Sequence, residues 1–292
     1  MTLLQAILLG IVQGLTEFIP ISSTAHLVLA ARVMQLGLTP EQTTASIAVI
    51  QLGTLIAVLI YFAGDIWNIS RAFIHDHFVL LKDGRRDQFN RKNEHAKLSQ
   101  EAWLGWLIII GTLPVVVVGL LFKRQIEGTF TKNLLVISIM MVVVAILLAI
   151  AEAVSKRQRR MQELGVKDAL AMGFAQCLAL IPGSSRSGST IMAGLFAGET
   201  RETAARFSFL LSIPAIAASG LLELKEALHK LPDGSLANLA AGTVVSGIVG
   251  YLSIWFLLRY LRTHTTGIFI GYRLIVGGAI LILVLMGKLS AL

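Results

Sequence analysis

Residues 4–31 read LQAILLGIVQGLTEFIPISSTAHLVLAA, an apolar run that is broken in its middle. The break is Pro20-Ile21-Ser22-Ser23-Thr24, and a proline there removes a backbone donor and interrupts a helix. In lipid, each peptide group freed by such a break would cost several kcal/mol, so the break is stable only inside protein or beside a water-filled cavity. We therefore predict a re-entrant helix–loop–helix hairpin, which enters and leaves the membrane on one side.

A second broken run lies at 169–197, where Pro182-Gly183-Ser184-Ser185-Arg186-Ser187-Gly188 interrupts it. The two runs share residue types in the same order. Ala6, Gly10, Gln13, Leu15, Ile19, Pro20, Ser22 and Ser23 in the first correspond to Ala169, Gly173, Gln176, Leu178, Ile181, Pro182, Ser184 and Ser185 in the second. The offset is 163 up to the leucines and 162 after a one-residue deletion. This pattern indicates an internal repeat and a second re-entrant hairpin.

The composition is that of a polytopic membrane protein. Of the 292 residues, 55% are hydrophobic and 14% are charged, against about 25% charged in soluble domains. The net charge of +8 lies in short connections between apolar runs, which indicates membrane orientation and excludes a nucleic-acid partner. The single cysteine, Cys177, excludes an intrachain disulfide.

Six further segments have the length of ordinary transmembrane helices: 45–63, 103–122, 133–154, 203–224, 236–258 and 268–288. The predicted fold is a single all-α membrane domain over 1–292, with six transmembrane helices, two re-entrant hairpins and repeat halves at about 1–122 and 133–288. This arrangement places fifteen Lys and Arg on the side of a long polar loop at 64–102, against seven on the other side, so the loop is predicted to be cytoplasmic. The hairpins then enter from opposite faces, as in an inverted-topology repeat with a midplane site.

The first hairpin carries polar groups that are costly in a membrane. Gln13 and Glu17 are spaced i, i+4 and share a helix face, and after the break Ser23 and His26 are spaced i, i+3. Charges at such depths are usually functional. A polar patch for helix packing is the alternative, and it is the favoured interpretation for Gln13 taken alone.

The second break has the residue types of a phosphate cradle. A helix begins there, so its free N–H groups and partial positive charge face the break, and the Arg186 fork matches phosphate oxygens. The candidate phosphate-binding residues are Gly183, Ser184, Ser185, Arg186, Ser187, Gly188, Ser189, Thr190 and, from the last apolar span, Arg273. A capped helix start with Arg186 paired to Glu17 is a compatible alternative. Arg273 is either a second phosphate ligand or a structural partner for Glu17.

The stretches 13–18, 20–26 and 182–190 resemble the undecaprenyl-diphosphate phosphatase family, also called the bacitracin-resistance family. The resemblance covers nearly the whole chain, and Ala25 stands where the family has glycine. It implies a phosphatase of the bacterial inner membrane that hydrolyses the lipid diphosphate on the periplasmic side, uses a divalent cation and confers bacitracin tolerance.

On this basis we expect Glu17, with Gln13, to hold Mg²⁺ or Ca²⁺, and Arg186 to hold phosphate oxygens. His26 is expected to act as nucleophile or as the base that activates Ser23 or water, and the sequence does not choose between these roles. The expected partners are a polyprenyl diphosphate and membrane lipid, and a homodimer is left open.

Three other functions fit parts of the sequence. A lipid-carrier flippase would suit an inverted repeat with the same midplane site. A phosphatase of the PAP2 type needs a histidine six residues after Arg186, where this chain has Met192. A purely structural membrane protein does not explain Glu17, His26, Arg186 and Arg273 at matching depths.

Overall fold

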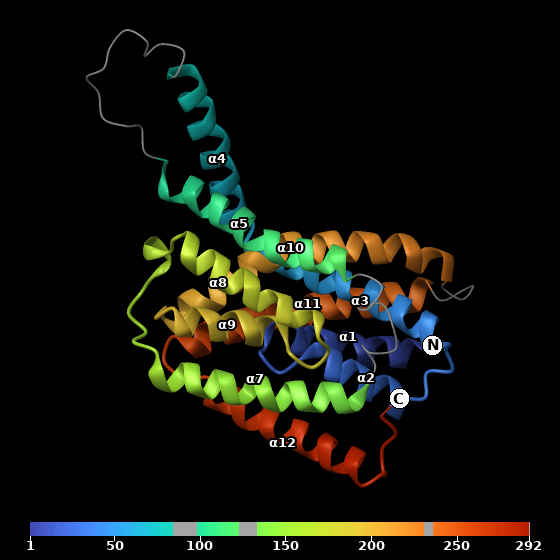
Figure 1. The fold of residues 1–292 in the computed structure, drawn as a ribbon. Helices are drawn as coiled ribbons and strands as arrows, with labels where there is room; N and C mark the ends of the chain where they lie inside the picture. The colour runs from blue at the N-terminus through green and yellow to red at the C-terminus, as the bar shows by residue number, and fades with distance from the viewer. Residues whose placement is uncertain (84–97, 123–132, 231–235, 292) are drawn as a thin grey trace.

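The computed structural model describes residues 1–83, 98–122, 133–230 and 236–291, and its regular elements in these ranges are all helices. They are α1 (Leu3–Phe18), α2 (Ser23–Val33), α3 (Pro40–Tyr61), α4 (Ala63–Asp83), α5 (Gln100–Leu121), α7 (Leu134–Val154), η2 (Met161–Glu163), α8 (Val166–Cys177), η3 (Leu178–Leu180), α9 (Arg186–Phe196), α10 (Arg201–Lys230), α11 (Leu236–Leu261) and α12 (Gly267–Leu285). Most of them run side by side in one bundle, and α4 projects away from it (Figure 1).

Five helices of the described ranges are long and apolar enough to cross a membrane: α3 from Glu41, α5, α7, α11 and α12. They match five of the six predicted spans. The sixth, 203–224, lies within the 30-residue helix α10, so the predicted helix is confirmed and its crossing stays a prediction.

Both predicted breaks are present, and each separates two short helices. The helices α1 and α2 have 16 and 11 residues, and α8 and α9 have 12 and 11, all shorter than the ~20 residues of a full span. The serine hydroxyl of Ser22 caps α2 and that of Ser185 caps α9, and both serines have positive φ, 79° and 68°. The caps are 163 residues apart. The predicted one-residue deletion, which paired Ser22 with Ser184 and Ser23 with Ser185, is therefore wrong at the helix starts.

One end of the bundle, here called the terminal end, gathers both chain termini (Figure 1). The amide of Asn238, at the start of α11, donates to the Met1 carbonyl at 3.0 Å, and Arg32, near the end of α2, donates to the Ser290 carbonyl at 2.9 Å. The start of α1 and the end of α2 therefore both lie at the terminal end.

The other end, here called the loop end, gathers the connections between helices. Arg159 binds Asp168 of α8 with two hydrogen bonds of 2.5 and 2.6 Å, and its backbone N–H donates to the Gly198 carbonyl just after α9. The start of α8 and the end of α9 therefore lie at the loop end. The two hairpins thus open toward opposite ends of the bundle.

Each hairpin has a glycine in backbone contact with a long helix. A Cβ on Gly10 of α1 would lie 2.3 Å from the Gly242 oxygen of α11, and a Cβ on Gly173 of α8 would lie 2.2 Å from the Gly111 oxygen of α5. No side chain fits at these distances, and small residues at such contacts are typical of helix packing in membranes. Gly10 and Gly173 are the glycines that the sequence repeat had paired.

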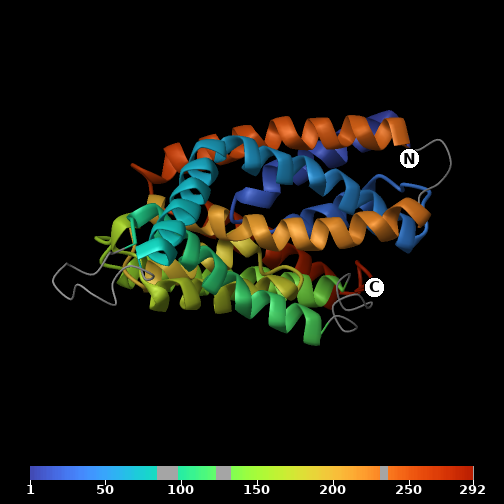
Figure 2. The same ribbon diagram turned by 90° about the horizontal axis from the view of Figure 1, so that it is seen from above.

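The prediction of a polar loop over 64–102 is wrong for its first part, because residues 63–83 form the helix α4, and residues 84–97 lie outside the described ranges. The helix runs across the direction of the bundle (Figure 2). One of its faces packs on α5, where the Trp106 indole N–H donates to His77 Nε2 at 3.0 Å and Phe73 covers Gly105. The opposite face is apolar and exposed. The polar composition of this segment thus led to a loop prediction, although the segment forms an amphipathic helix.

Candidate active site

The two breaks lie together and are joined by one side chain. Arg273 of α12 is fully buried and donates to the carbonyls of Gly183 at 3.0 Å and Ser184 at 3.1 Å in the second break. It also donates to the Pro20 carbonyl in the first break at 3.4 Å and, through Nε, to the Met141 carbonyl of α7 at 3.1 Å. The guanidinium thereby satisfies carbonyls that the broken helices leave without partners. Its role as a second phosphate ligand stays a prediction.

A buried ion pair bridges the breaks. The Arg186 guanidinium, at the start of α9, donates to Glu17 Oε1, near the end of α1. Of the two partners for Glu17 that the sequence left open, the structure shows Arg186, whereas Arg273 binds carbonyls instead. Removing one member of a buried pair leaves an uncompensated charge, so the two side chains depend on each other.

Gln13 lies one turn before Glu17 and extends the polar cluster. Its amide nitrogen donates to Glu17 Oε2 at 3.0 Å and lies 3.3 Å from the Thr54 hydroxyl of α3. Its carbonyl oxygen, Oε1, is buried and has no hydrogen-bond partner among the described residues. An unused carbonyl oxygen beside a carboxylate suits a hard divalent cation. The described ranges hold no cluster of three His, Cys, Asp or Glu side chains, so such an ion would need substrate oxygens to complete its shell.

The second break brings backbone close to the site. Gly183 has φ +91°, and a Cβ there would lie 2.2 Å from the Ile137 carbonyl of α7, so both conformation and space require glycine. The Ser185 hydroxyl accepts from the Gly188 N–H at 3.1 Å and lies 3.2 Å from the Ser187 hydroxyl. The first-turn N–H groups of Arg186 and Ser187 have no carbonyl partner within α9 and face the break.

The other hydroxyls of the predicted phosphate cradle form hydrogen bonds to other groups or are buried. Ser184 donates to the Ile181 carbonyl at 2.8 Å, and Thr190 lies 2.5 Å from the Ser208 hydroxyl of α10. The Ser189 hydroxyl is fully buried and has no partner within the described ranges. The geometry thus favours Arg186, Ser187 and the backbone over Ser184 and Thr190 as donors, and phosphate binding by each residue stays a prediction.

His26 is oriented by two partners. Its Nδ1 lies 2.7 Å from the Ser22 carbonyl, which can only accept, so Nδ1 carries the proton. In the neutral ring Nε2 therefore has a free lone pair, which accepts from the Tyr272 hydroxyl at 2.7 Å. The two rings stack at 5.6 Å between centroids. Ser23, one turn before His26, is half-buried at the start of α2.

Sequence reasoning missed Tyr272. Its only signal was its position beside the buried Arg273, because its partner His26 is 246 residues away in the chain.

Comparison with known protein families gives a match over most of the chain. The model of the family described as "Bacitracin resistance protein BacA" matches residues 6–279. The chain belongs to this family. With its five apolar helices, it is a multi-pass membrane protein.

Curated relatives cover nearly the whole length of the chain. A protein of Syntrophobacter fumaroxidans, named undecaprenyl-diphosphatase, is 52% identical over 283 residues, which are 96% of this chain and 97% of the relative. Proteins of the same name from Chlorobium phaeobacteroides and Mycolicibacterium gilvum are 48% and 43% identical, with full coverage of both chains. The family predicted from the motifs is therefore confirmed.

Proposed function

We infer that this chain is an undecaprenyl-diphosphate phosphatase. It hydrolyses undecaprenyl diphosphate to undecaprenyl phosphate and inorganic phosphate, which recycles the lipid carrier for peptidoglycan synthesis and confers bacitracin resistance. Family membership supports this inference. The structural observation that carries it is the buried Glu17–Arg186 pair, which places an acceptor and a phosphate-binding fork where the two breaks meet.

In the proposed reaction, Arg186 and the N–H groups at the start of α9 hold the terminal phosphate. Phosphoryl transfer depends mainly on positioning and on stabilising charge over the equatorial oxygens, and fixed donors at a helix start do both. A water oxygen ends on the terminal phosphorus while the bond to the bridging oxygen breaks. The bridging oxygen leaves with the lipid as undecaprenyl phosphate.

His26 supplies the nucleophilic side of the site. The hydrogen bond from Nδ1 to the Ser22 carbonyl fixes the tautomer, so Nε2 carries the lone pair. This lone pair becomes available for reaction when the hydrogen bond from the Tyr272 hydroxyl is broken. Nε2 either attacks phosphorus itself or takes the proton from Ser23 or water. The Tyr272 hydroxyl positions the ring in the resting state.

A divalent cation is part of the proposal. Glu17 and the free Gln13 oxygen would hold Mg²⁺ or Ca²⁺. Bound there, the cation would neutralise diphosphate charge, because Mg²⁺ is commonly held by one or two carboxylates together with substrate phosphates.

We also propose that both hairpins are re-entrant and form an inverted-topology repeat in the inner membrane, with α10 as a sixth span. The opposite openings of the hairpins and the matched contacts of Gly10 and Gly173 support this topology. The basic connections favour a cytoplasmic loop end and a site reached from the periplasm.

The decisive experiment is phosphate release from undecaprenyl diphosphate by purified protein in detergent, with and without EDTA. His26→Ala and Arg186→Ala serve as comparison variants. We expect release that requires metal and is lost in both variants. Absence of release by well-folded wild-type protein would contradict the phosphatase and favour a flippase, which vesicle transport would then test.

A further inference from the structure

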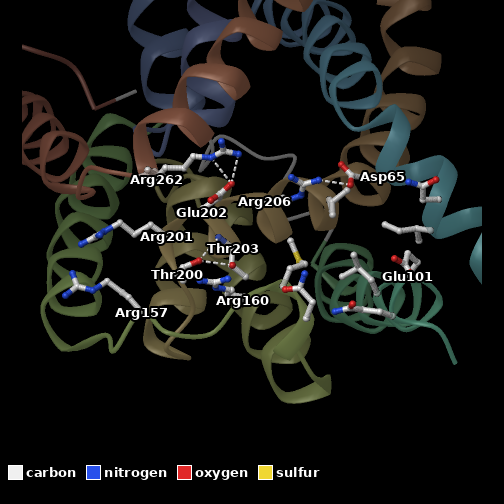
Figure 3. A pocket seen from close by; sticks show the side chains of 18 residues that line it. Asp65, Glu101, Arg157, Arg160, Thr200, Arg201, Glu202, Thr203, Arg206 and Arg262 are labelled. Carbon is white, nitrogen blue, oxygen red and sulfur yellow. Dashed lines mark hydrogen bonds and ion pairs between the residues drawn. The ribbon is translucent and has the colours of Figure 1, made fainter. Parts of the chain in front are cut away.

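The loop end of the bundle carries a pocket of about 790 Å³, within the range of about 300–1,000 Å³ typical of ligand sites. Five arginines line it: Arg157, Arg160, Arg201, Arg206 and Arg262 (Figure 3). We call it the arginine pocket. It lies beyond the far end of α9 from Arg186, and 11 residues at about 1.5 Å each place it roughly 16 Å from the ion pair at the breaks. It is therefore a separate site.

Four of the five arginines are held in place by carboxylates. Glu152 of α7 binds both Arg157 and Arg201, as the ion-pair geometry shows. The other two pairs are Arg206 with Asp65 at 2.6 Å and Arg262 with Glu202 at 2.8 Å, and both line the pocket (Figure 3). These pairs fix the directions of the guanidinium groups before any ligand binds, which lowers the ordering cost of binding.

The fifth arginine is not neutralised. The exposed guanidinium of Arg160 has no hydrogen bond or ion pair to any described residue. Counted with Glu101, which also lines the pocket, and with Glu152 behind it, five positive groups face four negative ones. The surplus is positive, and planar guanidinium groups match the oxygens of a phosphate.

One wall of the pocket belongs to a helix that also carries an exposed apolar surface. Asp65 and Asn68 of α4 line the pocket. The same helix exposes Trp67, Ile74, Phe78 and Leu81, each between 66% and 73% exposed. At 100° per residue these four side chains fall within about 60° of one helix face.

This exposed face of α4 is that of a helix at a membrane surface. Arg71 and Lys82 lie beside the apolar stripe, where long basic side chains reach lipid headgroups while their stems cover apolar surface. Because α4 runs across the bundle rather than along it (Figure 2), its stripe would lie along the plane of the leaflet if the bundle spans the membrane. Asp65 and Ile69, which line the pocket, lie on the opposite side of α4 from this stripe. A stripe buried in the leaflet would therefore hold the pocket beside the membrane surface, where lipid headgroups carry phosphate.

We propose that the arginine pocket is a second phosphate-binding site, which takes the headgroup phosphate of an anionic lipid. Free inorganic phosphate has the same chemistry and is the other source that the test must separate. The proposal stands independently of the hydrolysis proposed above, because it concerns different residues and its test measures binding, whereas the test of hydrolysis measures phosphate release.

The test uses full-length protein in detergent, with melting temperature and binding titrations as readouts. The probes are phosphatidylglycerol, phosphatidylcholine and sodium phosphate. The pocket variant is Arg160→Gln with Arg262→Gln. The matched control is Lys167→Gln with Arg259→Gln, which removes the same charge from exposed positions at the same end that do not line the pocket. Arg160→Gln alone breaks no contact to a described residue and serves as a second variant that should fold.

We expect phosphatidylglycerol to bind about tenfold more weakly to the pocket variant and to change by no more than about twofold in the control. Arg160→Gln alone should weaken binding in the same direction. Loss of a sodium phosphate response in the pocket variant alone would support the pocket with free phosphate as its ligand. Equal losses in the pocket variant and the control, or no response of wild type to either probe, would overturn the proposal. Phosphate bound at Arg186 should contribute equally to the signals of the pocket variant and the control, because neither variant alters the breaks.

Discussion

The two hairpins share one backbone design and differ in chemistry. Both are short helix pairs whose second helix starts at a serine with positive φ, and both place a glycine against a long helix. The first hairpin supplies the carboxylate of Glu17 and the imidazole of His26. The second supplies Arg186 and backbone donors. The two helix pairs therefore share a local geometry, whereas the polar side chains that they bring to the breaks differ.

The two glutamines at equivalent positions show the same divergence. Gln13 binds Glu17 and lies against Thr54, whereas Gln176 is fully buried with neither amide atom bonded to a described residue. Four residues after Gln176 the chain has Leu180 in place of a carboxylate. The two glutamines thus occupy similar places in their helices, and the side chain four residues later decides whether the amide has a carboxylate partner.

The largest effect is expected at His26, which belongs to the first hairpin only. His26→Ala should lower kcat for phosphate release by about 10²–10⁴-fold, the usual contribution of a positioned acid–base group. Stopped or continuous phosphate assays measure it, with gel filtration to verify folding. Turnover within a few-fold of wild type would remove the first hairpin's share of the chemistry.

Arg186 tests the second hairpin. Arg186→Lys keeps a charge for Glu17 but loses the bidentate fork, so kcat/KM should fall by about 10²–10³-fold. The melting temperature should change little compared with Arg186→Ala, which leaves the buried carboxylate unpaired. A lysine variant with near-normal kcat/KM would show that the second hairpin needs only a point charge.

The frame itself is tested by the two glycines. Gly10→Ala and Gly173→Ala should each destabilise the protein by about 1–3 kcal/mol, because the added methyl meets a carbonyl oxygen of a neighbouring helix. Gly278→Ala, which meets open space in α12, is the control. Thermal unfolding in detergent measures all three. Strongly unequal losses for the two glycines would break the equivalence of the hairpins.

The glutamines give a smaller and more selective effect. Gln13→Leu should reduce activity by about tenfold and raise the metal concentration needed, if its carbonyl contributes to cation binding. Gln176→Leu should leave activity unchanged and stabilise the fold by about 1 kcal/mol, because it removes an unsatisfied buried amide. Metal titrations and melting curves distinguish the two. Similar losses of activity would mean that both hairpins serve the cation.

The smallest effect on catalysis is expected at the loop end of the second hairpin, where Glu199 affects stability. Burial, together with the Asp168 carboxylate, raises the pKa of Glu199 to about 8. A carboxyl whose pKa is higher in the folded state binds more protons there, so the contribution of Glu199 to stability is fully present below pH 4.5 and is lost as pH rises toward 8. Glu199→Gln should therefore reduce the dependence of the melting temperature on pH between pH 6 and 9. An unchanged pH profile would show that Glu199 ionises normally.

Hydropathy and proline placement predicted much of this fold, because apolar length and broken backbone are local properties. They located all six long segments and both breaks. The sequence also indicated that Glu17 needs a cationic partner, because a buried charge requires one, but it left both Arg186 and Arg273 open, and the structure shows Arg186.

Other features depend on tertiary contacts that no local pattern contains. Tyr272 meets His26 only because α12 packs beside the first break, and the carbonyl contacts of Arg273 require both breaks at once. The helix α4 was missed for a different reason. Its apolar stripe at 67, 74, 78 and 81 has helical spacing, but a search for unbroken spans passes over it.

The contacts of Arg273 have a consequence for how such a site can change. One side chain of α12 sets the spacing between the two breaks by holding Pro20, Gly183 and Ser184 through their carbonyls, which every residue type possesses. Apart from Gly183, where conformation and space require glycine, these contacts do not depend on which side chains the breaks carry. Substitutions within the breaks can therefore change the chemistry of the site while Arg273 keeps the two backbones at the same separation.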